Sequence, residues 1–317
     1  MSTIHREQTT APGAGRRPLG RSRPRYGELA VQTVLFLAAL VSVLTTIGII
    51  VALAGPTISF LEEVSVVEFL TGTQWSPLFS DPQFGVLPLV SGTLIVTAIA
   101  VSVAVPIGLG GAIYLSEYAT SRARGILKPT LEILAGIPTV VFGFFALVAV
   151  TPLLQAGWPV GDGPDVFNAL SAGLVMGVMI IPTVASLAED AMSAVPHGLR
   201  YGAYALGSSK MQVSTRVVVP AAISGIVAAF VLGVSRAIGE TMIVAIAAGA
   251  TPNLTWNPLE GMQTMTGFIA AAGLGDQSVG TLGYKTLFAV GSLLFVMTLV
   301  MNIISIRLVR RYREVYE

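Results

Sequence analysis

Residues 82–116 read PQFGVLPLVSGTLIVTAIAVSVAVPIGLGGAIYLS, a run without a single charged side chain. An α-helix needs about 20 predominantly apolar residues to cross the hydrocarbon core of a bilayer, so this run is long enough to span one. Four similar charge-free runs cover residues 29–61, 133–161, 166–188 and 286–306. A further apolar run, 217–259, is interrupted only by Arg236 and Glu240. The pattern predicts an all-α integral membrane protein with six transmembrane helices.

The composition agrees with lipid as the main solvent of the chain. The 317 residues are 53% hydrophobic and only 11% charged, whereas a soluble domain carries about a quarter charged residues. The absence of cysteine excludes disulfides, thiolate metal sites and cysteine nucleophiles. Two histidines are too few for a histidine metal cluster. We therefore expect neither a metal nor another cofactor.

The placement of basic residues predicts the orientation in the membrane. Of the 18 Lys and Arg residues, all except Arg236 and Lys285 lie in the two tails or in the loops around 122–128 and 200–216. The intervening loops carry acidic residues instead. Because Lys and Arg are enriched in cytoplasmic loops, both termini are expected in the cytoplasm. An odd number of spans would break this alternation.

The chain is expected to hold one membrane domain between two short tails. Residues 1–28, rich in Arg, Gly, Pro and Ser, are predicted to form a disordered basic cytoplasmic tail that contacts anionic membrane lipid. Residues 29–313 are assigned to the transmembrane domain, with a core at about 86–308 and a peripheral first span. Residues 314–317 form the C-terminal end. Small residues such as Gly173 and Gly177 are expected at contacts between helices.

Arg236 and Glu240 are the most informative charged residues, because they fall inside an apolar segment. An ionised side chain at that depth costs a few kcal/mol or more, which makes it a candidate functional group. The spacing of four residues places both groups on one helix face, where they can neutralise each other. A guanidinium also matches the oxygens of phosphate, and Thr241 adds a hydroxyl. The pair indicates either a polar transport pathway or a structural ion pair.

The cytoplasmic segment from Glu189 to Arg216 is the second candidate site. Residues 201–206 could form a short amphipathic helix that ends at Gly207, and Pro220 would suit the first turn of the following span. A helix at this place would be a docking element for a cytoplasmic partner. It could equally be an ordinary connector.

This segment resembles the loop motif of ABC importer permeases, which reads Glu-Ala-Ala, three residues, Gly, nine residues, Ile-x-Leu-Pro. The chain keeps Ala203, Gly207 and Pro220 in register, whereas Tyr201 and Gly202 replace the motif's Glu and first Ala. The resemblance implies that the segment docks on an ATPase. The ATPase-coupling residues it implies are Ala203, Tyr204, Leu206, Gly207 and Pro220.

Four further segments resemble the phosphate branch of this family, and in particular its C-type permease subunits (PstC). They are residues 69–77, 91–119, 134–147 and 235–242. The resemblance implies a type I importer-like bundle in a prokaryotic inner membrane, with Arg236 and Glu240 on the pathway of inorganic phosphate. It also implies three kinds of partner: a sibling permease subunit, two cytoplasmic ATP-binding subunits and an extracytoplasmic phosphate-binding protein.

The alternatives concern the energy source and the substrate. The chain contains no G-x-x-x-x-G-K-[ST] motif, so it is not expected to be an enzyme, and ATP hydrolysis would occur in a separate subunit. A permease for another oxyanion, sulfate or molybdate, stays open. A secondary transporter would also show a buried charge and broken helices, although six spans is a small number for one. No nucleic-acid partner is expected.

Overall fold

The computed structural model describes residues 26–79, 81–159, 161, 163–275 and 277–311. The chain divides into two units, Met1–Val51 and Ala52–Glu317. The described part of the first unit is helical, as the beginning of α1 (Tyr26–Glu63). Most of the predicted disordered tail lies outside the described residues, as does the segment 314–317. Tyr26, Gly27 and Glu28, the last residues of the predicted tail, are helical.

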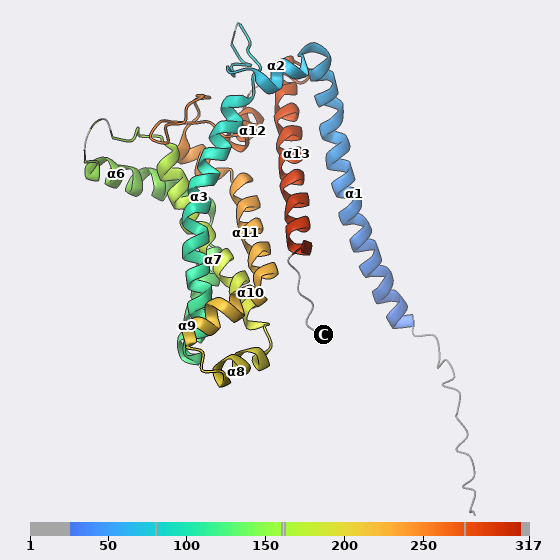
Figure 1. Cartoon of the computed structure of the whole chain (residues 1–317). Coiled ribbons are helices and arrows are strands. Elements are labelled where there is room, and N and C mark those ends of the chain that lie inside the picture. Colours follow the sequence, from blue (N-terminus) through green and yellow to red (C-terminus); the bar gives the residue numbers. More distant parts are fainter. Residues whose placement is uncertain (1–25, 80, 160, 162, 276, 312–317) are drawn as a thin grey trace, which may run out of the picture. The chain divides into compact units, whose positions relative to one another are not determined.

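The second unit, which begins within α1, is built from helices and short π-helical turns (Figure 1). Its first elements after α1 are α2 (Val66–Thr71), α3 (Leu87–Ile113), η1 (Tyr114–Tyr118), α4 (Ser121–Ala135), α5 (Thr139–Phe145), η2 (Ala146–Val150), α6 (Thr151–Gly157) and α7 (Ala169–Ser193). The remaining elements are α8 (His197–Ala205), α9 (Lys210–Val213), η3 (Ser214–Val218), α10 (Val219–Ala221), α11 (Ile223–Ile238), η4 (Val244–Ala248), α12 (Met265–Leu274) and α13 (Leu282–Arg311). Within the described residues the only β-pairing is one isolated bridge, between Trp75 and Phe84.

Five helical segments are long and apolar enough to cross a membrane. They are Tyr26–Glu63, Leu87–Tyr118, Thr139–Gly157, Ala169–Ser193 and Leu282–Arg307. A sixth crossing is a bent pair, Lys210–Ala221 and Ile223–Ile238, whose two helices meet at 73°. Counted as one span, this pair completes the predicted six. Pro220 lies in the first turn of α10, two residues before the bend at Ala222.

Helix α7 is the centre of the second unit. It packs along most of α3, as Figure 1 shows, and also contacts α4 and α11. Gly173 and Gly177 lie at the contact with α3, where a Cβ on Gly177 would stand 2.9 Å from the carbonyl oxygen of Ala100. The expectation that these glycines allow close helix packing is therefore confirmed.

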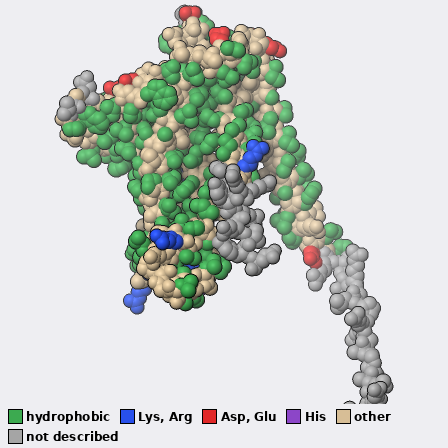
Figure 2. Space-filling model, in the orientation of Figure 1, with side chains coloured by type: hydrophobic (Ala, Val, Ile, Leu, Met, Phe, Trp, Pro, Cys, Tyr) green, Lys and Arg blue, Asp and Glu red, His purple; other side chains and the backbone are tan. Residues whose placement is uncertain are grey.

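An aromatic cluster holds the end of the unit that carries α2 and α12. Phe60, at the end of α1, packs edge-on against Phe69 and Phe84, and Trp75 packs edge-on against Phe268. Such edge-to-face pairs stabilise a fold beyond the burial of their area. Figure 2 shows hydrophobic side chains over the visible flanks of the unit, with acidic groups at this end and basic groups towards α8.

Two further predicted boundaries differ from the structure. The third span is shorter than residues 133–161, because the chain breaks at Gly136 and the basic segment before it folds into the separate amphipathic helix α4. The predicted loop from Glu189 to Arg216 is also mostly helical. Glu189 lies within α7, and Lys210 and Arg216 lie in the first half of the bent span.

Candidate functional site

The apolar segment that carries Arg236 and Glu240 is not one continuous helix. Helix α11 ends at Ile238, and the amide of Gly239 donates to the carbonyl of Ser235 at 3.2 Å. Helical structure resumes at Met242 and continues through η4. Residues 239–241 are therefore a break inside the predicted span. Broken helices at membrane depth are tolerated where they are buried in protein or line a cavity.

Arg236 lies in the last turn of α11 and is half-buried. Its Nη1 donates a hydrogen bond to the Thr183 hydroxyl of α7 at 3.0 Å. Among the residues that the structure describes, this is the only hydrogen bond of the Arg236 side chain, and the side chain forms no ion pair. The C-terminal end of a helix favours a cation. Most donors of the guanidinium nevertheless have no partner among the described residues.

The Glu240 side chain binds the backbone of the residues that follow it. It is only 8% exposed, and its Oε1 accepts hydrogen bonds from the amides of Met242 at 3.0 Å and Ile243 at 3.3 Å. The carboxylate thus caps the N-terminal end of the helix that follows the break, where a negative charge is favourable. The expectation that Glu240 and Arg236 share one helix face and neutralise each other is wrong, because the helix ends between them.

Thr241 is the last residue of the break, and four further threonines lie close to Glu240. The Thr241 hydroxyl donates to the Gly239 carbonyl at 3.4 Å. A crevice beside Glu240, too narrow to hold a water molecule, is lined in part by Thr93, Thr97, Thr264 and Thr266. The Thr266 hydroxyl donates to the Glu240 carbonyl at 2.6 Å, which ties the break to the start of α12.

These threonines were missed by the sequence analysis. The only available signal was that Thr93 and Thr97 are four residues apart in an apolar run, which places them on one face of α3. Thr264 and Thr266 precede or begin a ten-residue helix with no such pattern. Their proximity to Glu240 depends on tertiary contacts.

The second candidate site, the predicted docking helix, is α8. It begins four residues earlier than predicted, at His197, and Gly207 follows it with a left-handed φ of 81°. The Gly207 amide donates to the Tyr204 carbonyl at 2.9 Å, and the Ser208 amide donates to the Ala203 carbonyl at 3.1 Å, so the last turn is closed. Leu206, 89% exposed, projects an apolar side chain beside it. Pro220 is also exposed, and α9 and η3 lie between it and α8 in the sequence.

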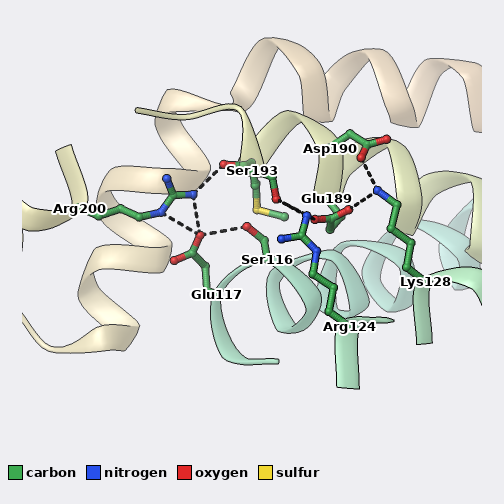
Figure 3. Close-up of polar contacts among 9 residues, drawn as sticks. Ser116, Glu117, Arg124, Lys128, Glu189, Asp190, Ser193 and Arg200 are labelled. Carbon is green, nitrogen blue, oxygen red and sulfur yellow. Dashed lines mark hydrogen bonds and ion pairs between the residues drawn. The ribbon is translucent and has the colours of Figure 1, made fainter. Parts of the chain in front are cut away.

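A partly buried polar cluster connects α8 with its neighbours (Figure 3). Arg200 of α8 pairs with Glu117 of η1, and Glu189 of α7 pairs with Arg124 and Lys128 of α4. The sequence analysis used the basic residues of this cluster only as indicators of membrane orientation and predicted no partner for Glu117 or Glu189. Sequence separations of 61 to 83 residues between the partners gave no local pattern to detect.

The chain is similar to a known protein family and to several of its members. Residues 104–314 match the profile described as "Binding-protein-dependent transport system inner membrane component". The chain is 35% identical over 297 residues to "Probable ABC transporter permease protein YqgH" of Bacillus subtilis, with 93% of this chain and 94% of the relative covered. It is 36% identical over 279 residues to "Phosphate transport system permease protein PstC 1" of Mycobacterium tuberculosis, with 77% and 82% covered.

A solved structure shares the fold. It is the crystal structure of a bacterial alginate ABC transporter in complex with an alginate pentasaccharide-bound periplasmic protein. The TM-score is 0.61 at 16% sequence identity, and the match covers 91% of this chain and 98% of that chain. The similarity extends over nearly all of the helical architecture described above.

Proposed function

The chain belongs to the family of binding-protein-dependent transport system inner membrane components, and from this premise we propose that it is the permease subunit of an ATP-driven importer of inorganic phosphate. The predicted family and the predicted ABC importer permease fold are confirmed. Phosphate as the substrate is supported by relatives at 30% to 36% identity that are named as phosphate transport permeases.

The observation that carries the proposal is that the Arg236 guanidinium has no acidic partner among the described residues. A cation within a span is costly unless a partner compensates its charge. In the described chain Arg236 has one neutral hydroxyl as a partner and no carboxylate. A guanidinium with free donors in a fixed fork binds phosphate oxygens in a bidentate manner. We therefore assign Arg236 to the phosphate pathway.

Glu240 and Thr241 are assigned supporting roles at the same break. Because Glu240 caps the following helix, it does not pair with Arg236, and the guanidinium stays open to an incoming anion. Its acidic charge nearby would still limit the affinity, so that phosphate can leave again. Thr241, five residues after Arg236 in the sequence, would have to exchange its hydrogen bond to the Gly239 carbonyl for one to phosphate.

The assembly follows from the family. The chain forms a multi-pass protein of a prokaryotic inner membrane, and it works with the ABC partners of its relatives. We propose that a sibling permease completes the translocation path, that two cytoplasmic ATP-binding subunits hydrolyse ATP, and that an extracytoplasmic phosphate-binding protein delivers the substrate. The face formed by Ala203, Tyr204, Leu206 and Gly207 is the proposed contact with one ATP-binding subunit, and Pro220 shapes the span behind it. Surrounding lipid covers the apolar flanks.

Cysteine labelling is expected to place α8 in the cytoplasm, together with both termini. The chain has no native cysteine, so single cysteines can be introduced at Leu206, which is 89% exposed, and at Val279, which is 82% exposed. In intact cells a membrane-impermeant maleimide should label V279C but not L206C. Lysed cells that lack the ATP-binding subunits serve as the control, since Leu206 is then uncovered and both sites should react. Labelling of L206C in intact cells would reject the proposed orientation.

Omission of single partners tests the transport class. Vesicles are prepared with the chain, its sibling permease, the ATP-binding subunits and the binding protein, and then with each component left out in turn. We expect uptake of labelled phosphate only when all are present and ATP lies on the side of the ATP-binding subunits. Uptake in vesicles that lack the ATP-binding subunits would instead establish a secondary transporter.

A further inference from the structure

Arg200 joins α8 to two other elements through one guanidinium (Figure 3). Its Nε and Nη2 donate to Oε1 of Glu117, at 3.2 and 2.9 Å. Nη2 also donates to the Met192 carbonyl at 2.8 Å, and Nη1 donates to the Val195 carbonyl at 2.5 Å. Arg200 is only 8% exposed. Charge-assisted bonds in such a setting are strong and are costly to break one partner at a time.

The two carbonyls belong to the end of α7 and to the turn that follows it. Carbonyl groups at a helix C-terminus have no partner within the helix, and a cation there is favoured by the helix dipole. Arg200, which belongs to the neighbouring helix α8, therefore caps the C-terminal end of α7. Since only three residues, Ala194 to Pro196, connect the two helices, the guanidinium and this short turn link them at two points.

The same end of α7 is fixed on its other side by α4. Glu189, which is fully buried, pairs with Arg124 and with Lys128, the latter at 2.8 Å, and Lys128 also pairs with Asp190. The hydrogen bonds to Asp190 and Glu189 raise the pKa of Lys128 above 10.5. Because the folded-state pKa is raised, this contribution to stability is complete at neutral pH and is lost only as the pH rises through that raised value.

Helix α7 also carries a contact to the proposed phosphate pathway. Thr183, which accepts the hydrogen bond from Arg236, precedes Met192 by nine residues, or about 14 Å along the helix at about 1.5 Å per residue. The contacts thus place Arg200 at one end of a helix and the Arg236 partner in its middle. A displacement of α8 that keeps the Arg200 bonds must displace α7 as well.

We propose that Arg200 is the positioning residue that makes α8 and α7 move as one body, so that motion of the ATP-binding subunits reaches the phosphate pathway. The inference rests on the proposed function, in which α8 docks on an ATP-binding subunit. Arg200 acts through α7 and does not touch the substrate. Without its guanidinium, α8 follows the ATP-binding subunit while α7 lags behind.

The test is the ratio of phosphate transported to ATP hydrolysed by the complete reconstituted transporter. Arg200→Met keeps the long apolar stem and removes every hydrogen bond of the guanidinium. We expect ATP hydrolysis to persist while the ratio falls roughly tenfold, within the range of typical coupling free energies. Arg200→Lys, which keeps the charge, should recover part of the ratio.

Two further variants make the result decisive. Arg122→Met is the matched control, because Arg122 is an exposed arginine of α4 without a hydrogen bond or ion pair among the described residues. Glu117→Gln removes the charge that orients the Arg200 guanidinium towards the two carbonyls, so it weakens the link to α7 even if Arg200→Met does not assemble. It should lower the ratio less than Arg200→Met does.

An unchanged ratio in Arg200→Met and Glu117→Gln, or a parallel loss of hydrolysis and uptake, would overturn the inference and leave Arg200 a purely structural residue. Should Arg200→Met fail to assemble, an unchanged ratio in Glu117→Gln alone would overturn it. A wild-type transporter that takes up no phosphate with ATP would instead reject the proposed function. The two failures are therefore distinguishable in the same experiment.

Discussion

Arg236→Gln is expected to lower the initial rate of phosphate uptake at least about thirtyfold, because loss of a desolvated charged contact costs roughly 2–5 kcal/mol and each 1.4 kcal/mol is about tenfold. Glutamine preserves the length and the hydrogen bond to Thr183 in part, but it lacks the charge and the fork of donors. The measurement is uptake of labelled phosphate by the reconstituted transporter at a low phosphate concentration. The uptake rate of Arg236→Lys should lie between those of the wild type and Arg236→Gln, since lysine keeps the charge but not the fork of donors.

The control for this variant is Arg122→Gln, which also removes one arginine but from an exposed position on α4. Its uptake should match that of the wild type. Co-purification of the partner subunits shows whether Arg236→Gln still assembles. Full activity in an assembled Arg236→Gln transporter would exclude Arg236 from the pathway and leave its bond to Thr183 as a structural contact.

Gly177→Val is expected to destabilise the helix bundle more than any conservative surface change. A Cβ at this position would stand 2.9 Å from both the Ala100 carbonyl oxygen and the Val103 Cβ, and valine adds two methyl groups beyond it. Overpacking of this kind costs about 1–3 kcal/mol, occasionally more. The midpoint of thermal unfolding in detergent, followed by loss of the monodisperse protein, should fall by several degrees.

Gly110→Val provides the matched control, because it makes the same substitution in α3 at a position where an added Cβ meets no other atom within 4 Å. Its thermal midpoint should stay close to that of the wild type. Equal midpoints for the two variants would contradict the close packing of α3 and α7 at Gly177.

The spans and the docking helix could be predicted because their signals are local. Runs of apolar residues set the number of crossings, and Gly207 marks the end of α8 because its left-handed backbone favours glycine. The close approach at Gly173 and Gly177 was also readable, since the four-residue spacing puts both glycines on one side of α7. Each of these predictions depends on residues within one or two helical turns of each other.

The pairing of charges could not be read in the same way. The expected ion pair of Arg236 with Glu240 assumed a continuous helix, whereas the chain breaks at Gly239 and the carboxylate caps the next helix. Arg200 and Glu117 are 83 residues apart, so their contact depends on how α3 and α7 pack. In both cases the partner of a charged side chain depends on where helices end and how they pack. The pattern of apolar residues does not show this.

The most direct test of the phosphate assignment is uptake of labelled phosphate by the complete transporter with ATP, measured beside labelled sulfate and labelled molybdate under the same conditions. We predict ATP-dependent uptake of phosphate that an excess of unlabelled sulfate or molybdate does not reduce, and no uptake of labelled sulfate or molybdate. ATP-dependent uptake of sulfate or molybdate in place of phosphate would contradict the assignment of the substrate.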